Sequence, residues 1–354
     1  MNSQELAVDG WRRVVRFSDP ASGLEAIIAV HDATLGPACG GCRVRPYASF
    51  EAALDDVKRL SRGMTFKNAL GGIPFGGGKA VIIADPKTQK TPAMMRAFGR
   101  AVDSLGGLYY TAEDSGVDEH DMETVRSVTK YVAGIAQKGV GGNPSPFTAR
   151  GVWRGIEAAA QARLGRASLQ GLRVAILGVG AVGMTLAELL HEAGASLVVA
   201  DVNDAAAREA VARFGAVAVA PEDCIAAEVD IFSPCALGGS ISKDAIARLK
   251  AKIVAGAANN QLLTPDMDKA LFDRGVLYAP DYVINAAGVI SVGLEILGQW
   301  SQDELNRRID AIGPRLAAIF ARSAQSRHPT GAIADEMALE VIAAGARAYS
   351  AATA

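Results

Sequence analysis

The feature that most constrains the fold is a regular alternation of apolar and helical segments after Gly165. Short apolar runs that predict buried strands lie at 172–177, 196–200, 229–233, 252–256 and 276–279. Segments that predict helices lie between them, near 181–193, 204–213, 242–250 and 265–274. Strands separated by helices of this length favour right-handed βαβ units and a parallel sheet. The second half of the chain is therefore predicted to be a doubly wound α/β domain.

A glycine motif marks the first turn of this domain. Gly178, Gly180 and Gly183 follow the first strand and open the next helix. At such a turn the first glycine permits the bend, the second lets a pyrophosphate approach the backbone, and the third lets helix and strand pack closely. The helix N-terminus adds free N–H groups. The predicted dinucleotide site consists of Gly178, Val179, Gly180, Ala181, Val182 and Gly183, and a glycine-rich turn without a ligand is the alternative.

The cofactor preference depends on the residue that ends the second strand. Asp201 stands there and would accept hydrogen bonds from the adenosine ribose hydroxyls. It would also repel a 2′-phosphate, and no arginine follows at 202–204 to offset this. With Val202 beside it, Asp201 favours NAD over NADP.

The first half of the chain is predicted to be mixed α/β. Its predicted strands lie at 24–30 and 80–84, and its predicted helices at 50–69 and 92–105. A Gly/Pro/Ser run at 139–146 reads as a linker, with Ser145 as a helix N-cap and Pro146 at the first helical position. Residues 302–348 have the composition and period of helices.

Composition excludes several classes of protein. A length of 354 residues suggests about two domains. A net charge of −2 leaves no basic field for nucleic acid, and the longest uncharged stretches are too short to span a membrane. Four cysteines form no disulfide framework. We therefore expect a soluble, cytoplasmic protein that binds neither nucleic acid nor membrane.

No metal site is expected either. Cys39 and Cys42 form a C-x-x-C motif, but a zinc site needs a second pair at suitable spacing. The four histidines show no ligand spacing. Cys39 is expected in a pocket wall and Cys42 in the core.

Three ordered motifs carry a family resemblance. Residues 64–79 contain Lys67 and end in Gly-Gly-Gly-Lys79, residues 111–114 read Thr-Ala-Glu-Asp, and residues 142–146 read Gly-Asn-Pro-Ser-Pro. Together they resemble the glutamate/leucine/phenylalanine/valine dehydrogenase family, and its leucine-type members most of all. The resemblance continues through 234–239, 258–262 and 279–285.

This resemblance implies a fold, a reaction and a set of roles. The reaction is reversible oxidative deamination of an L-amino acid to a 2-oxo acid and ammonia with NAD. Lys79 would be catalytic, and Asp114 would transfer protons at the amino group. The other implied contacts are Lys67, Gly40 and Gly41 to the substrate carboxylate, Thr148 and Ala236 to the cofactor, and Asn260 to both ligands.

The implied architecture places the site in a cleft between two domains. Residues 1–145 would form a mixed α/β domain for substrate binding and oligomerisation, and 146–330 a Rossmann NAD-binding domain. Residues 331–354 would form a C-terminal helical segment, for which packing back on the first domain is one option. The resemblance also implies a homo-oligomer.

The chemistry supports a lysine site independently. When a hydride leaves Cα, the iminium that forms must be attacked by water, which a neutral lysine can activate. A second ammonium nearby and partial desolvation both favour a neutral lysine. Lys67 and Lys79 flank a glycine-rich turn and would supply this arrangement. The alternative is that both are surface lysines.

Three positions matched by the resemblance predict an apolar substrate side chain. Glutamate-specific members carry a lysine at the position of Cys39 and a hydroxyl at that of Val292, so an acidic substrate would lack a partner here. Ala112 and Val292 resemble the leucine-type pocket, and Val289 adds an apolar wall. Because Cys39 is smaller than the usual aliphatic residue, an aromatic L-amino acid such as phenylalanine is the alternative. A non-catalytic NAD-binding sensor is the alternative of another class, and intact Lys67, Lys79 and Asp114 argue against it.

Overall fold

The computed structural model describes residues 1–135 and 143–353, which form two compact units. Unit 1 comprises Met1–Gly142, Val289–Gln302 and Ala338–Ala354, and unit 2 comprises Asn143–Gly288 and Asp303–Met337. The expected division at 145 and 330 differs from this one, because two later segments return to unit 1. The first contains α11 (Ala287–Ile296), where Gly293 packs so closely on Ile73 that a Cβ would lie 3.0 Å from Ile73 Cδ1.

Unit 1 is built on a mixed sheet, as predicted. Its strand order is β1–β2–β3–β6–β4–β7, with β5 also paired to β6. The strands are β1 (Asn2–Leu6), β2 (Arg13–Asp19), β3 (Leu24–Asp32), β4 (Ala38–Cys39), β5 (Cys42–Arg45), β6 (Gly76–Ile83) and β7 (Tyr109–Tyr110). Strands β1, β2, β3 and β6 pair antiparallel, whereas β4 and β5 run parallel to β6. Only β3 and β6 were predicted from the sequence.

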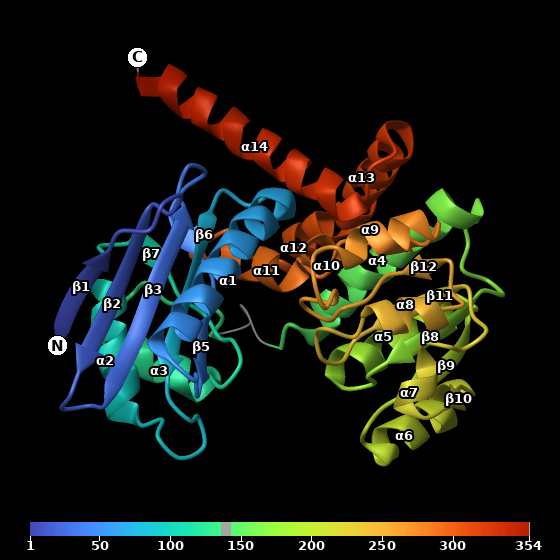
Figure 1. Cartoon of the computed structure of the whole chain (residues 1–354), viewed down its shortest axis with the longest axis horizontal. Helices are drawn as coiled ribbons and strands as arrows, with labels where there is room; N and C mark the ends of the chain where they lie inside the picture. The colour runs from blue at the N-terminus through green and yellow to red at the C-terminus, as the bar shows by residue number, and fades with distance from the viewer. Residues whose placement is uncertain (136–142, 354) are drawn as a thin grey trace. The chain divides into compact units, whose positions relative to one another are not determined.

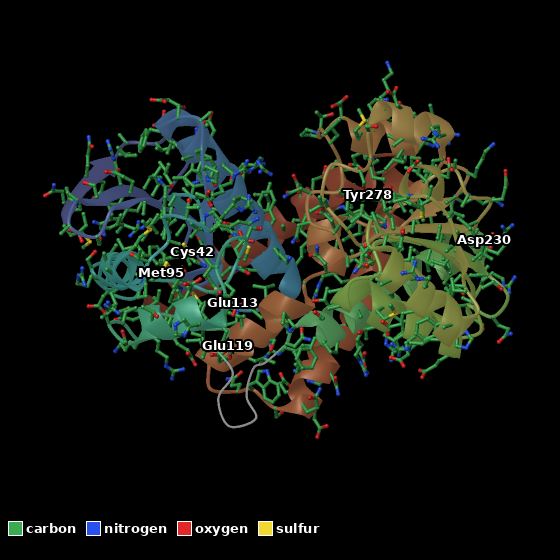
Figure 2. All side chains as sticks on the ribbon, turned by 90° about the horizontal axis from the view of Figure 1, so that it is seen from below. Cys42, Met95, Glu113, Glu119, Asp230 and Tyr278 are labelled. Carbon is green, nitrogen blue, oxygen red and sulfur yellow. The ribbon has the colours of Figure 1, made fainter. Side chains whose placement is uncertain are left out.

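Helices cover both faces of this sheet (Figure 1). Helix α1 (Phe50–Gly71) buries Val57 against Ile27 and Val81 on one face. Helices α2 (Pro92–Asp103) and α3 (Glu119–Arg126) cover the other face, where the core includes Cys42 and Met95 (Figure 2). The alternation of a strand sends successive residues of β3 into the two cores.

The main chains of strand β6 and helix α1 are in direct contact. A Cβ at Gly77 would lie 2.1 Å from the Thr65 backbone nitrogen, so only glycine fits there. The buried Asn68 side chain donates to the Gly76 carbonyl at 2.6 Å and to the Cys39 carbonyl at 3.2 Å. These contacts fix the strand that carries Lys79 against the helix that carries Lys67.

Unit 2 is the doubly wound domain that the sequence predicts. Its six strands are all parallel and have the order β10–β9–β8–β11–β12–β13. The strands are β8 (Arg173–Leu177), β9 (Ser196–Ala200), β10 (Val217–Ala218), β11 (Ile231–Pro234), β12 (Ile253–Val254) and β13 (Leu277–Tyr278). The order reverses between β8 and β11, and ligands of such sheets bind at that point.

The four helices predicted between the strands of unit 2 lie close to their expected positions. The helices between strands are α5 (Ala181–Glu192), α6 (Asp204–Phe214), α7 (Pro221–Cys224), α8 (Lys243–Arg248) and α9 (Met267–Asp273). The remaining helices of unit 2 are α4 (Ser145–Leu164), α10 (Asp281–Ile284), α12 (Gln302–Asp310) and α13 (Ile312–Ser326). The predicted four are α5, α6, α8 and α9, whereas the short α7 and α10 were not predicted. Helix α14 (Thr330–Thr353) begins in unit 2 and belongs to unit 1 from Ala338 onward. Within the described ranges, none of the helices combines the length and apolarity that crossing a membrane requires.

The predicted N-cap of α4 was wrong. Pro144 occupies the N-cap position and makes no side-chain cap, and Ser145 is already the first helical residue. The Asn143 side chain accepts a hydrogen bond from the Ser145 amide at 3.0 Å, so an asparagine turn starts the helix instead. The first part of the predicted linker, up to 142, lies outside the described residues.

Gly77→Ala is expected to lower the stability of unit 1 by about 1–3 kcal/mol, because the new methyl group overlaps the Thr65 backbone. Gly63→Ala on α1 is the matched control. No atom lies within 4 Å of its added Cβ, so this change is expected to be neutral or to stabilise by about 0.5–1 kcal/mol. Thermal unfolding of both variants measures the difference. Equal thermal unfolding midpoints for the two variants would show that Gly77 is not packed tightly against the Thr65 backbone.

Candidate functional site

Lys79 and Asp114 form a shielded ion pair in unit 1. Lys79 lies on β6, and Asp114 follows β7 in the loop after Thr111. The Lys79 Nζ is 2.6 Å from Asp114 Oδ2, and the two side chains are 8% and 20% exposed. By strand alternation Lys79 shares a face with Val81, which packs against α1. Both predicted lysines therefore belong to the same side of the sheet.

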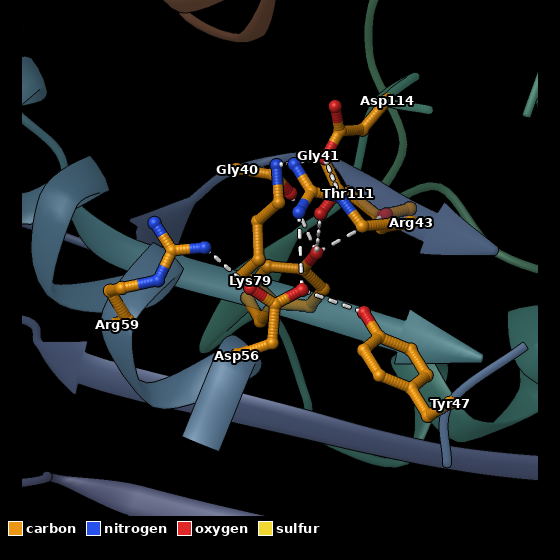
Figure 3. Close-up of polar contacts among 10 residues, drawn as sticks. Gly40, Gly41, Arg43, Tyr47, Asp56, Arg59, Lys79, Thr111 and Asp114 are labelled. Atoms are coloured by element: carbon orange, nitrogen blue, oxygen red, sulfur yellow. Dashed lines mark hydrogen bonds and ion pairs between the residues drawn. The ribbon is translucent and has the colours of Figure 1, made fainter. Parts of the chain in front are cut away.

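A third charged group contacts this pair. Arg43 on β5 donates from Nε to the same Asp114 oxygen at 3.2 Å (Figure 3). Burial favours the neutral form of Asp114, but the charges of Lys79 and Arg43 outweigh it, so the pKa of Asp114 is lowered. Asp114 is thus an ionised carboxylate at neutral pH, ready to accept a proton.

Glycines pack the predicted carboxylate site tightly. A Cβ at Gly40 would lie 2.0 Å from the Gly78 carbonyl oxygen, and one at Gly41 would lie 2.3 Å from that of Glu113. The Gly40 amide donates to the Tyr110 carbonyl at 3.2 Å, and the Gly40 carbonyl accepts from the Tyr109 hydroxyl at 2.6 Å. The Gly40 amide is thereby used within the sheet, which makes Gly41 the better candidate for a carboxylate ligand.

Two of the four residues predicted for the side-chain pocket lie next to a residue that the sequence reasoning missed. Cys39 is 1% exposed on β4, Ala112 lies after β7, and Val292 lies on α11. A Cβ at Gly134 would lie 3.7 Å from Ala112 Cβ and 3.8 Å from Val292 Cγ2. Gly134 thus brings two predicted pocket residues together. On the same helix, Val289 lies 3.9 Å from a Cβ built on Gly71.

Glu295 holds Gly134 in place. It lies one helical turn after Val292, and its Oε2 accepts a hydrogen bond from the Gly134 amide at 2.9 Å. Burial raises the pKa of this carboxyl, although backbone amides at Gly134 and Ile135 stabilise its charge. An acidic residue within an otherwise apolar helix was the available signal for this contact.

In unit 2 the three motif glycines meet three different requirements. Gly178 has φ +98°, and its Cβ would lie 2.7 Å from Ala236 Cβ. A Cβ at Gly183 would lie 1.9 Å from the Gly178 carbonyl oxygen. Gly180, the N-cap of α5, has no atom within 4 Å of its Cβ position. The open space at that helix N-terminus, which Ala181 and Val182 continue, fits a pyrophosphate.

The carboxylate of Asp201 is held by two backbone amides. Its Oδ2 accepts from Val179 and its Oδ1 from Asn203, each at 2.8 Å. Val202 beside it is 93% exposed. The acidic group is therefore fixed next to the glycine turn, as a ribose ligand must be.

The remaining predicted cofactor contacts also lie in unit 2. Ala236 follows β11 and adjoins Gly178, at the point where the strand order reverses. Asn260 has φ +51°, which is uncommon for a residue with a side chain, and its carbonyl accepts from the Gly239 amide at 2.7 Å. Thr148 lies on α4, with its hydroxyl 3.8 Å from a Cβ built on Gly288.

A cavity of about 320 Å³ opens next to the glycine turn. Its wall includes Leu177, which directly precedes Gly178, together with Ile225, Ser240 and Ala245. Its walls are partly apolar and also include the charged residues Glu222, Asp244 and Arg248.

Comparisons with known proteins identify the family of the chain. Residues 12–131 match the family model "Glu/Leu/Phe/Val dehydrogenase, dimerisation domain", and residues 199–348 match "Glutamate/Leucine/Phenylalanine/Valine dehydrogenase". Leucine dehydrogenase of Geobacillus stearothermophilus is 49% identical over 333 residues, covering 94% of this chain and 90% of that protein. Valine dehydrogenase of Streptomyces virginiae is 45% identical, covering 93% of both chains. The crystal structure of L-tryptophan dehydrogenase from Nostoc punctiforme has a TM-score of 0.85 at 42% identity, covering 95% of this chain and 97% of that one.

These matches define the class of protein. The chain belongs to the glutamate/leucine/phenylalanine/valine dehydrogenase family, as its motifs predicted. It is an amino-acid dehydrogenase, and therefore an oxidoreductase. Leucine dehydrogenases are among its relatives, in agreement with the predicted resemblance to leucine-type members.

The two cysteines of the C-x-x-C motif are free and buried. Burial raises the pKa of Cys39 to about 12 and that of Cys42 also well above its ordinary value. Throughout 1–135 and 143–353, no three His, Cys, Asp or Glu side chains are grouped as a metal site requires.

Both thiols are therefore expected to resist iodoacetamide at pH 8, where almost none of either is thiolate. Peptide mass spectrometry of the native and denatured protein measures the labelling. Ala52→Cys, at an exposed position of α1, supplies a reactive reference thiol. Labelling of Cys39 in the native protein as fast as this reference would contradict the prediction.

Proposed function

We propose that this protein catalyses the reversible, NAD-dependent oxidative deamination of branched-chain L-amino acids, with leucine as the typical substrate. The products are the 2-oxo acid and ammonia. The buried Lys79–Asp114 pair carries the proposal, because it places a proton donor and a proton acceptor together beside Gly41. The 49% identity to a leucine dehydrogenase supports the substrate class.

Each group in unit 1 has a role in this reaction. Lys67 and the Gly41 amide bind the substrate carboxylate. Asp114, ionised because its pKa is lowered, accepts a proton from the substrate amino group. Lys79 activates the water that attacks the oxidised Cα, with its amine oriented by Asp114 at 2.6 Å.

NAD, when bound, accepts the hydride that leaves Cα. The residues of unit 2 fit this cofactor. The open N-terminus of α5 at Gly180 receives the pyrophosphate, and the fixed Asp201 carboxylate receives the ribose hydroxyls. We assign the adenine to the cavity beside Leu177, and Thr148, Ala236 and Asn260 to the rest of the cofactor.

The pocket residues support an apolar substrate. Cys39, Ala112, Val289 and Val292 carry no charge that could pair with an acidic side chain, and leaving such a group unpaired costs several kcal/mol. An aromatic L-amino acid is the second candidate, because Cys39 and Gly134 are small and a relative of known structure is an L-tryptophan dehydrogenase. Methylene-sized differences give only about 1–3 kcal/mol of discrimination, so leucine, valine and isoleucine are all expected to react.

We further propose that the protein is a cytoplasmic homo-oligomer. The family model that matches residues 12–131 is described as a dimerisation domain. The four free cysteines are in keeping with a reducing compartment.

The direct test measures NADH formation at alkaline pH with L-leucine, L-valine, L-phenylalanine, L-tryptophan and L-glutamate. Leucine or valine is expected to react best and glutamate not at all. Lys79→Ala is expected to lower kcat by about 100- to 10,000-fold, since it removes the acid–base group. Lys269→Ala, at an exposed position of α9, is the control and retains full activity. Near-normal turnover of Lys79→Ala, or binding of NAD without any amino-acid-dependent NADH, would contradict the proposal.

The cofactor assignment has its own test. Asp201→Asn is expected to reduce the preference for NAD over NADP by at least about tenfold, because the negative charge that repels a 2′-phosphate is lost. Comparing kcat/KM for the two cofactors measures this preference. Asp204→Asn, exposed at the start of α6, removes the same charge nearby and is expected to change it little. A preference that survives in Asp201→Asn would place the discrimination elsewhere.

A further inference from the structure

Arg43 connects the catalytic pair to a second carboxylate. Its Nε lies 3.2 Å from Asp114 Oδ2, and one of its terminal nitrogens lies 3.1 Å from Asp56 Oδ2. The Arg43 side chain is 15% exposed and that of Asp56 11% exposed, so water screens neither contact strongly. A shielded chain of alternating charges thus runs from Lys79 through Asp114 and Arg43 to Asp56 (Figure 3).

Asp56 is itself firmly held. Its Oδ2 also accepts from the Tyr47 hydroxyl at 2.8 Å, and its Oδ1 contacts Arg59 at 2.6 Å. Burial opposes the charge of Asp56, but these donors and Arg43 outweigh it and lower its pKa. Burial and the neighbouring Asp56 also raise the pKa of Tyr47, so its hydroxyl stays protonated and continues to donate.

Because the guanidinium is planar, the contact with Asp56 also fixes the orientation of the Arg43 side chain. Its nitrogens are fixed relative to one another, so a contact at one terminal nitrogen restricts the direction of the Nε–H bond. With Asp56 on one side, that bond points at Asp114. We propose that Arg43, anchored by Asp56 and Tyr47, is a positioning residue that holds Asp114 in place for proton transfer. This inference rests on the proposed function and adds a residue to it.

The arrangement has a chemical purpose. Lys79 must change its own protonation state during the reaction, so its attraction for Asp114 varies within each turnover. Arg43 cannot be deprotonated in a protein, and therefore supplies a constant positive charge to the same carboxylate oxygen. Arg43 thus keeps Asp114 oriented and favours its ionised form between proton transfers.

The other titratable groups near Asp114 do not replace this charge. Besides Lys79 on β6 and Arg43 on β5, these are Cys42 on β5 and Tyr109 on β7. Burial raises the pKa of both, so they stay neutral. Removal of Arg43 therefore leaves Lys79 as the one cation in contact with Asp114 among the described residues.

The experiment compares Arg43→Gln and Arg43→Lys in the full-length protein, with Arg16→Gln as control. Arg16 is a half-exposed arginine on β2 of the same unit, paired with Glu25. Steady-state NADH formation with L-leucine and NAD is measured across pH, and NADH binding by fluorescence. Arg43→Gln is expected to lower kcat by about 10- to 100-fold, as misplaced catalytic groups do, with NADH affinity unchanged.

The pH profile separates positioning from a structural effect. Because Arg43 lowers the pKa of Asp114, its loss raises that pKa and moves the acidic limb of kcat/KM to higher pH. Arg43→Lys keeps the charge and is expected to restore the limb, but only part of kcat, because an ammonium lacks the planar fork. Asp56→Asn is expected to lower kcat in the same direction by a smaller factor.

Results that would contradict the positioning role differ from results that would contradict the proposed function. Wild-type kcat and an unmoved acidic limb in Arg43→Gln would overturn the positioning role while leaving the proposed function intact. Equal losses in the glutamine and lysine variants with an unmoved limb would assign Arg43 to the fold alone. A wild-type protein that forms no NADH from any amino acid would overturn the proposed function, and this inference with it.

Discussion

The contact between Lys79 and Asp114 requires several segments of the main chain to approach one another more closely than intervening side chains would allow. Lys79 lies on a strand whose Gly77 touches the backbone of α1, and Gly41 touches the backbone just before Asp114. A side chain at Gly77 would push the strand of Lys79 away from α1, and one at Gly41 would collide with the backbone that leads into Asp114. Because these glycines have no side chain, the main-chain segments around the site can come into direct contact, and the buried ion pair depends on this close approach.

The same constraint recurs in unit 2 with a different outcome. At Gly178 and Gly183 close packing excludes a side chain, as it does at Gly77, whereas at Gly180 the structure leaves space. The first two hold helix α5 against the sheet, and the third keeps the N-terminus of the helix open to an anion. The same motif thus fixes the position of α5 and leaves its N-terminus accessible to an anion. Asp201, whose carboxylate accepts a hydrogen bond from the Val179 amide, places a negative charge beside the motif.

Elements with strong hydrophobic periodicity could be predicted from the sequence. Strand β3 and helix α1 bury one face or both, and the parallel strands of unit 2 are short apolar runs separated by helices. Strand β1 could not be predicted, because it is an edge strand whose residues are mostly exposed and show no apolar alternation. Strands β4 and β7 are two residues long and exist only through their pairing with neighbours.

Among the site residues, Lys79 and Asp114 could be found because they lie in recognisable motifs. The roles of Arg43 and Glu295 could not, because their partners lie 71 and 161 residues away. No local pattern marks the Arg43 contact, and the isolated acidic residue in α11 marks Glu295 as unusual without identifying its partner.

The return of α11 to unit 1 has a consequence for how the protein must be made. Val292 and Glu295, which complete the apolar pocket and hold Gly134, are separated from the rest of that pocket by most of unit 2. A ribosome that has synthesised only the first sheet and its helices has made Lys67, Lys79 and Asp114, but not the α11 residues that contact Gly134. Domains tend to fold as units during synthesis, yet this one stays incomplete until the whole nucleotide-binding domain has been translated. The charged residues proposed for catalysis are therefore present in the nascent chain well before the residues that complete the proposed substrate pocket.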